Sequence, residues 1–116
     1  MPRKDDLNRL YHMLEAAREA VGYARGRQRE ELETDRPLTH SLIRCLEIVG
    51  EAAARVSPEF RESHPEFEWA DMIGMRNRLI HVYFDINLNI VWRTVSEELP
   101  RLIAQIEPIL KAEGMT

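Results

Sequence analysis

The apolar residues of this chain recur at steps of three and four, the spacing of one face of an α-helix. The first such stretch predicts a helix over about residues 5–25, with Asp5 or Asp6 as its N-cap and Gly26 as its end. Its apolar positions are Leu7, Leu10, Leu14, Ala17, Val21 and Ala24. The charged stretch that follows lacks a full apolar stripe and predicts only a short helix over Glu30–Asp35.

A second apolar stripe predicts a long helix that starts at Thr39 or Ser41 and reaches about Val56. Gly50 lies inside it, where glycine costs roughly 1 kcal/mol relative to alanine, so we expect another helix to approach closely there. A Ser-Pro pair directly after Val56 ends the helix and predicts a single turn that reaches Phe60.

The second half of the chain predicts two further long helices. One runs from about Trp69 to near His81, and the other covers about residues 89–112. The intervening segment Asp85–Asn89 indicates a turn or a helix cap, because Asp and Asn side chains bond to nearby backbone groups. Pro100 lies inside the last helix and predicts a kink or a split there.

Together these elements predict an all-α fold: an antiparallel bundle of four main helices with one or two short ones. With 116 residues, of which 44% are hydrophobic and 31% charged, the chain is expected to form one globular domain over residues 1–116. Apolar runs are far shorter than a bilayer requires, and the first residues lack the apolar core of a signal peptide. We therefore expect a soluble, cytoplasmic protein without membrane contact.

Charge and cysteine content narrow the possible chemistry. The single cysteine, Cys45, excludes an intrachain disulfide and a Cys-rich zinc site, and its place in an apolar stripe predicts a buried thiol. The net charge is −4, whereas proteins that bind nucleic acid electrostatically are usually basic. If the protein acts on RNA, a local cluster of arginines must bind the RNA phosphates. The sequence contains no phosphate-binding glycine loop or zinc-protease motif, and we expect no cofactor and no metal.

The segment that ends the third predicted helix carries most of the candidate chemistry. Arg76, Asn77, Arg78, His81 and Tyr83 fall within eight residues of an otherwise apolar stretch. On a continuous helix, Asn77 and Arg78 would each share a face with His81. Arg76 would lie about 140° away from it. Arg76 and His81 therefore converge only if the helix ends or distorts near His81, or if a second protomer contributes one of them.

The spacing Arg76-x4-His81-x-Tyr83 resembles the signature of HepT-like toxins, a branch of the HEPN ribonucleases. Asn77 fits the wider HEPN pattern, which has a polar residue directly after the arginine. The flanking stretches look like those of the same family: Leu46-Glu-Ile-Val-Gly-Glu-Ala-Ala53, Trp69 and Val91-Trp92. The likeness runs from about Leu7 to Leu110.

This resemblance implies a homodimeric, HEPN-like ribonuclease in which motif residues of two protomers line one cleft. It implies RNA cleavage without a metal, by attack of the neighbouring 2′-hydroxyl, so DNA should not be cut. His81 would exchange the protons, and Arg76 would stabilise the charge that develops on the phosphate. Asn77 would orient His81 or bind a phosphate. Arg78 is equally consistent with a second phosphate contact and with an ordinary salt bridge.

The resemblance also implies a toxin–antitoxin pair. In HepT-like toxins the tyrosine of the motif accepts AMP from a partner, a minimal nucleotidyltransferase of the MntA type, so Tyr83 is the expected modification site. AMP there would compete with RNA phosphate for the same arginines. The alternatives are an unmodified, half-buried Tyr83 and a chain that acts as a catalytically silent HEPN subunit regulating a nucleotidyltransferase.

A purely structural helical bundle is the remaining interpretation, and it leaves the polar motif unexplained. Glu47 and Glu51 lie four residues apart on the second predicted helix and so share one face. We interpret them as a solvated or salt-bridged surface and not as part of the site.

Overall fold

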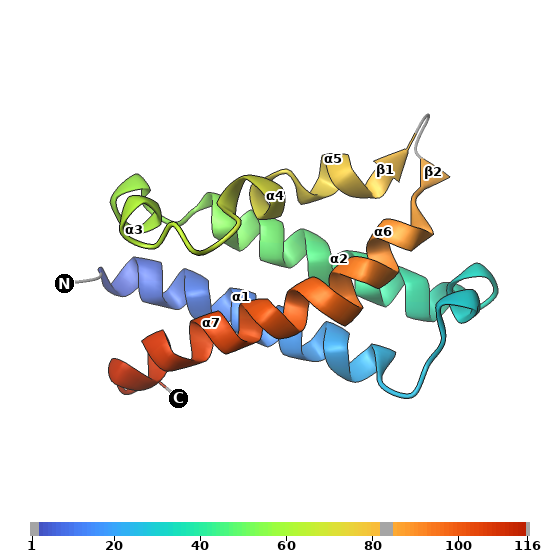
Figure 1. Cartoon of the computed structure of the whole chain (residues 1–116), viewed down its shortest axis with the longest axis horizontal. Helices are drawn as coiled ribbons and strands as arrows, with labels where there is room; N and C mark the ends of the chain where they lie inside the picture. The colour runs from blue at the N-terminus through green and yellow to red at the C-terminus, as the bar shows by residue number, and fades with distance from the viewer. Residues whose placement is uncertain (1–2, 82–84, 116) are drawn as a thin grey trace.

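The computed structural model describes the backbone of residues 3–81 and 85–115, and the side chains of these residues except those at positions 80, 81 and 85. Within these ranges the fold is all-α, as predicted, apart from two strands of two residues each. Figure 1 shows α1 and α2 antiparallel along the length of the molecule, with α7 crossing them. No helix among the described residues is long and apolar enough to cross a bilayer.

The first long helix, α1 (Lys4–Ala24), has the predicted length and ends near Gly26, whose φ of 75° suits glycine. The predicted N-cap is wrong. Arg3 occupies the cap position, and Asp6 lies within the helix with only 4% of its surface exposed. Asp6 instead accepts hydrogen bonds from the backbone N–H and the Oγ of Ser57, at 2.8 and 2.7 Å. The carboxylate therefore ties α1 to the start of the short helix α3 (Pro58–Ser63).

The connection between the first two long helices contains η1 (Arg29–Glu33), a 3₁₀ turn near the predicted short helix. The second long helix, α2 (Arg36–Ala54), begins before both predicted starts, three residues before Thr39 and five before Ser41. Its N-cap is Asp35, whose carboxylate accepts a hydrogen bond from the N–H of Leu38, and a proline occupies the first turn. This Asp-x-Pro signal marks the true start of the helix. Cys45 on this helix is buried, as predicted, and burial raises the pKa of its thiol to about 11.

The third predicted helix is broken into two short ones, α4 (Trp69–Ile73) and α5 (Met75–Leu79). Gly74 separates them, with φ and ψ of −84° and 13°, outside the α-helical region. The chain then becomes extended: β1 (Ile80–His81) pairs antiparallel with β2 (Asp85–Ile86). The backbone N–H of Asn87 also bonds to the carbonyl of Leu79. The expectation of a continuous helix to His81 is therefore wrong.

The last predicted helix is divided into three pieces that follow one another without a loop: α6 (Leu88–Arg93), η2 (Thr94–Glu98) and α7 (Leu99–Ala112). Asn87 caps α6 by accepting a hydrogen bond from the N–H of Ile90, as the Asp–Asn segment predicted. The segment η2 is a π-helical turn, and Pro100 occupies the first turn of α7. Pro100 therefore lies at the predicted split, where its missing N–H removes little.

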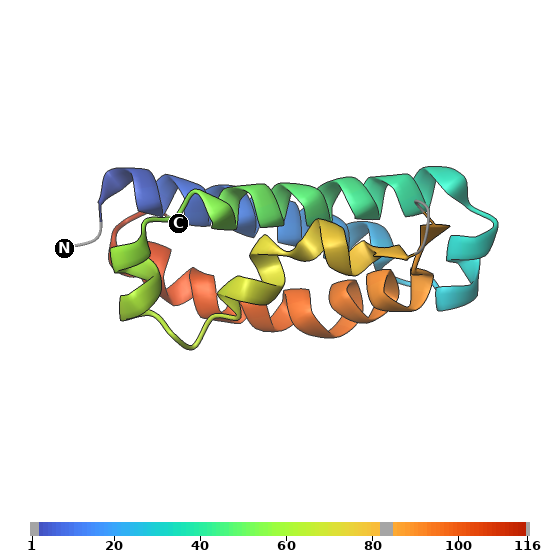
Figure 2. The same ribbon diagram turned by 90° about the horizontal axis from the view of Figure 1, so that it is seen from above.

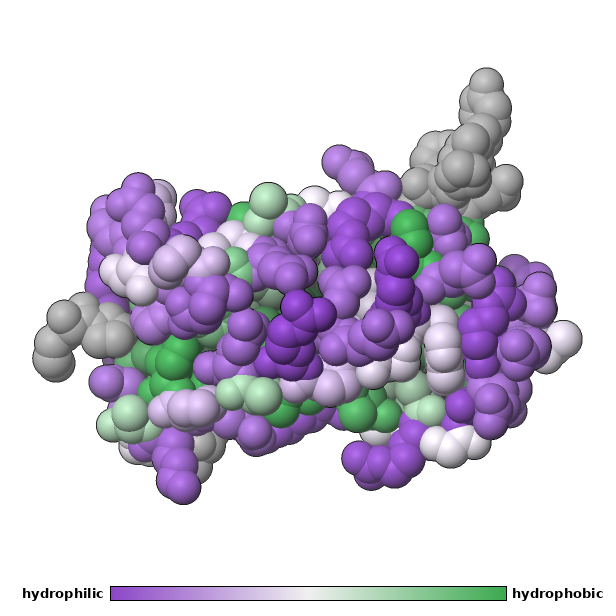
Figure 3. Space-filling view, in the orientation of Figure 1, coloured by the Kyte–Doolittle hydropathy of each residue, from purple (hydrophilic) through white to green (hydrophobic). Residues whose placement is uncertain are grey.

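The helices form two layers, with α1 and α2 in one and the run from α6 to α7 in the other. Figure 2 shows α4 and α5 between α2 and this run. One continuous core fills the space between the layers, and leucines of α1, α2 and α7 are almost fully buried in it: Leu10, Leu14, Leu42, Leu46, Leu99 and Leu110. The face in Figure 3 is mostly hydrophilic and carries only small, separate apolar areas.

At Gly50 the backbone of α4 approaches α2 closely. A Cβ at this position would lie 2.7 Å from the carbonyl oxygen of Met72 and 3.3 Å from the Cβ of Met75. The first atom belongs to the backbone of α4, so it cannot move aside without displacing the helix. The predicted close approach at Gly50 is confirmed.

We predict that Gly50→Ala lowers the free energy of unfolding by about 1–3 kcal/mol, because overpacking outweighs the better helix propensity of alanine. Urea denaturation measures the change. Gly22→Ala is the matched control, since Gly22 lies within α1 and a Cβ there would meet nothing within 4 Å. That variant should gain up to about 1 kcal/mol. Equal stabilities of the two variants would contradict the tight contact at Gly50.

Candidate active site

The helix α5 is held by two residues at its ends, Met75 and Leu79, which are 2% and 1% exposed. They lie four residues apart and therefore face the core together. The residues between them, Arg76, Asn77 and Arg78, are left on the sides and outer surface of this short helix. The sequence Met-Arg-Asn-Arg-Leu thus anchors a polar segment to the core at both ends.

Arg76 and Arg78 leave α5 on opposite sides. Positions two residues apart on an α-helix are separated by about 200°. The two side chains therefore lie on either side of the buried face formed by Met75 and Leu79. Arg78 points toward the layer of α6 and α7, where its Nη1 and Nη2 donate to the two oxygens of Glu98 at 3.2 and 3.0 Å. The hydrogen bonds to the Glu98 carboxylate raise the pKa of Arg78 above its ordinary value. A phosphate contact by Arg78 would have to compete with this ion pair.

Arg76 lies on the side of α5 that faces α2. It is exposed, and it makes no ion pair or side-chain hydrogen bond with another described residue. A cavity of about 230 Å³ opens beside it. The cavity is lined by Arg76 together with Glu47, Gly50, Glu51, Ala54, Ile73 and Met75. A guanidinium at the edge of an open cavity can reach an anionic ligand.

The carboxylates of α2 next to Arg76 were not expected at the site. Glu47 is half-buried and Glu51 is exposed, and both line the cavity. Glu51 also lies 3.9 Å from Arg44, so the predicted salt-bridged surface is present. The four-residue spacing of Glu47 and Glu51 indicated a shared face, but only the packing of α4 and α5 on α2 reveals that Arg76 shares it.

His81 follows α5 on extended backbone. It belongs to β1, and its position in the strand pair is opposite Asp85. The predicted helix face shared by His81 with Asn77 and Arg78 is therefore wrong, and the helix ends before His81, one of the conditions for Arg76 and His81 to converge. The side chain of His81 and the whole of Tyr83 lie outside the described residues. Asn77 is exposed on α5, and its role stays a prediction.

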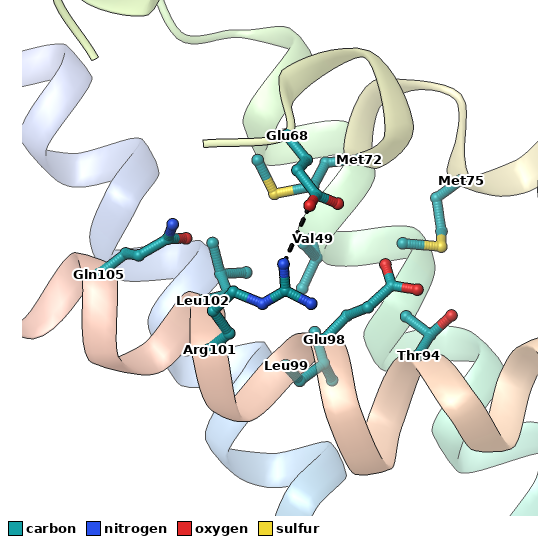
Figure 4. Close-up of a pocket in the computed structure, with 10 residues that line it drawn as sticks. All are labelled: Val49, Glu68, Met72, Met75, Thr94, Glu98, Leu99, Arg101, Leu102 and Gln105. Carbon is teal, nitrogen blue, oxygen red and sulfur yellow. Dashed lines mark hydrogen bonds and ion pairs between the residues drawn. The ribbon is translucent and has the colours of Figure 1, made fainter. Parts of the chain in front are cut away.

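A second cavity lies on the other side of α5, between α4 and the start of α7 (Figure 4). It measures about 30 Å³, which holds only one or two water molecules. Figure 4 shows the guanidinium of Arg101 directed at Glu68, and the two groups are 3.1 Å apart. The rest of the lining mixes apolar side chains such as Met72 and Leu102 with the polar Thr94, Glu98 and Gln105. This cavity is a small gap in the packing between the layers, and Arg76 does not line it.

Comparison with known proteins identifies the family of this chain. The family model described as ribonuclease HepT-like matches residues 13–109. The chain belongs to the HepT-like ribonuclease family. Arg76 and His81 lie within the matched part of this HepT-like chain, as does the cavity lined by Glu47 and Glu51.

Several curated proteins are similar to this HepT-like chain. A protein of Caldanaerobacter subterraneus subsp. tengcongensis named "Putative RNase" is 38% identical over 104 residues, which are 90% of this chain and 93% of that protein. One of the same name from Methanocaldococcus jannaschii is 32% identical over 111 residues, 96% of this chain and 92% of the relative. "Probable ribonuclease HepT" of Thermococcus cleftensis is 38% identical over 82 residues, 71% of this chain and 74% of the relative. No solved structure matches the chain.

We predict that Arg78 and Glu98 stabilise the fold as a pair. Each side chain is 23% exposed, so the two charges are partly shielded from water. In a double-mutant cycle of Arg78→Gln and Glu98→Gln, the coupling free energy should be about 1 kcal/mol or more. The exposed pair of Arg3 and Glu59, 67% and 73% exposed and 3.5 Å apart, is the control and should give less than about 0.5 kcal/mol. Equal couplings in thermal denaturation would argue against a structural role for Arg78.

Proposed function

We propose that this HepT-like ribonuclease is the toxin of a toxin–antitoxin pair, a metal-independent endoribonuclease neutralised by a partner nucleotidyltransferase. The observation that carries the proposal is the position of Arg76. It lies within the residues that the family model matches, is exposed beside an open cavity, and has no described carboxylate paired with it. Arg78, two residues later, is by contrast held in an ion pair with Glu98.

The proposed reaction uses Arg76 and His81. The imidazole of His81 takes the proton from a ribose 2′-hydroxyl, whose oxygen then forms a bond to the adjacent phosphorus. The bond to the 5′-oxygen of the next nucleotide breaks, and that oxygen takes up a proton from the imidazolium of His81 or from water, which leaves the total number of protons unchanged. The products are a 2′,3′-cyclic phosphate and a 5′-hydroxyl. The planar guanidinium of Arg76 binds the phosphate oxygens while negative charge builds up on them.

A homodimer would complete the site. Ile73 is one of two large hydrophobic side chains that are clearly exposed among the described residues, at 36%. It lines the cavity beside Arg76 and also a shallow depression next to Pro58 and Trp69. A second protomer packed on Ile73 would bury this apolar surface and bring its own motif close to Arg76.

We expect Arg76→Ala and His81→Ala each to lower RNA cleavage by about a hundredfold or more, because one removes phosphate stabilisation and the other proton transfer. The assay follows a labelled RNA in excess EDTA, and mass spectrometry identifies the cyclic phosphate. A substrate with 2′-deoxyribose at the cut site should not react. Arg25→Ala, a change at an exposed arginine after α1, is the control. A folded His81→Ala protein that cuts at the wild-type rate would contradict the mechanism.

The regulation is expected to act through Tyr83. Its phenolic oxygen would attack the α-phosphorus of ATP on the partner nucleotidyltransferase, releasing pyrophosphate and the phenolic proton. The phosphodiester left on Tyr83 would bring a negative charge near Arg76 and compete with RNA for it.

Tyr83→Phe should cut RNA and escape neutralisation, since it keeps the ring but lacks the acceptor oxygen. The measurement is RNA cleavage after incubation with the nucleotidyltransferase and ATP, with peptide mass mapping to locate AMP. Tyr23→Phe on α1 is the matched control and should be neutralised like wild type. If Tyr83→Phe is neutralised as well, the partner acts by covering the cleft. If neither the chain nor its variants cut RNA, the silent regulatory subunit becomes the better interpretation.

A further inference from the structure

A cleft of about 130 Å³ on the outer surface of α1 and α2 is not used by the motif. It is lined by Arg9, His12, Ile48, Glu51, Ala52 and Arg55. Arg9 and His12 lie three residues apart on α1, and Arg55 directly follows α2. Ala52 is 5% exposed, and its small side chain leaves room for the cleft between the two helices.

The cleft gathers positive charge on a protein whose net charge is −4. Most arginines that contact a described carboxylate lie elsewhere, as in the pairs of Arg18 with Glu107 and Arg101 with Glu68. Arg9 and Arg55 make no such ion pair within the described part of the chain. The one carboxylate in the cleft, Glu51, lies 3.9 Å from Arg44, which offsets part of its charge. Two arginines with uncommitted donors and an imidazole can bind a phosphate.

The cleft and the cavity at Arg76 share one lining residue. Glu51 lines both, with the Arg76 cavity on one side of α2 and the Arg9–Arg55 cleft on the other. A helix with its side chains is about 10–12 Å across, so a short stretch of nucleic acid can span the two hollows. Phosphates repeat along an RNA strand, and a strand bound at Arg76 can therefore present a second phosphate at the cleft.

We propose that Arg9, His12 and Arg55 form a second phosphate-binding subsite, which holds the RNA strand a few nucleotides away from the phosphate at Arg76. The inference rests on the proposed ribonuclease function. The subsite would give this acidic protein a local set of arginines for RNA phosphate, with Arg76 on one side of Glu51 and Arg9 and Arg55 on the other. Base edges are not involved, so the subsite increases affinity without reading sequence.

The test measures binding of a fluorescent 2′-O-methyl oligoribonucleotide, which cannot be cleaved, to the full chain. The variant Arg9→Gln/Arg55→Gln should raise the Kd by roughly tenfold. The slope of log K against log salt should decrease by about 0.7 for each phosphate that the variant no longer neutralises. The matched control is Arg25→Gln/Arg36→Gln, at two exposed arginines outside the cleft, with the same change in net charge. Glu51→Gln should act in the opposite direction and lower the Kd.

Cleavage kinetics separate a binding subsite from the reacting groups. With a long RNA, Arg9→Gln/Arg55→Gln should raise KM and leave kcat unchanged. With a dinucleotide, whose single phosphate is at Arg76, the variant should match wild type.

If wild type cuts RNA but the cleft variant behaves like the Arg25/Arg36 control, the proposed subsite is wrong and the proposed ribonuclease function is retained. The same holds if the cleft variant weakens only binding to the nucleotidyltransferase. If wild type neither binds nor cuts RNA, the subsite and the proposed function fall together. Circular dichroism and thermal denaturation establish that each variant is folded.

Discussion

The contact between Gly50 and the backbone of Met72 determines where the motif lies. Since a Cβ at Gly50 would come within 2.7 Å of that carbonyl oxygen, α4 can lie against α2 only because position 50 has no side chain. This contact brings Met72 and Met75 into the core, where they are 7% and 2% exposed. The same packing places Arg76 next to Glu47 and Glu51 across the cavity. A larger residue at position 50 would separate α4 from α2 and change the surroundings of Arg76.

The ion pairs of this acidic chain divide its arginines into two groups. Arg78 and Arg101 bind carboxylates and connect α4 and α5 with the layer of α7. Arg76, Arg9 and Arg55 are among the arginines that make no ion pair with a described residue, and these three line two hollows that share Glu51. The net charge of this protein is therefore a poor guide to phosphate binding. What matters is which arginines keep their hydrogen-bond donors available.

Much of the fold could be predicted from local pattern. The lengths of α1 and α2, the stop at Gly26, the cap at Asn87 and the split near Pro100 each follow from neighbouring residues in the sequence. The errors arose where a distant contact decides. Asp6 is a residue type that often caps helices, but its carboxylate accepts hydrogen bonds from Ser57, 51 residues away. The helix expected up to His81 ends at Leu79, because extended pairing with residues 85–86 replaces another helical turn.

The sequence by itself determined the helical class, the motif residues Arg76 and His81, and the family, because periodicity and residue spacing are local properties of the chain. Only the tertiary structure decided which arginine of α5 is held in an ion pair. Whether an arginine is engaged or available depends on carboxylates brought near by folding, such as Glu98 for Arg78 and Glu47 near Arg76. In the sequence, Arg76 and Arg78 look alike, because their positions do not indicate which layer each side of α5 faces. The packing of α4 and α5 on α2 sets this orientation.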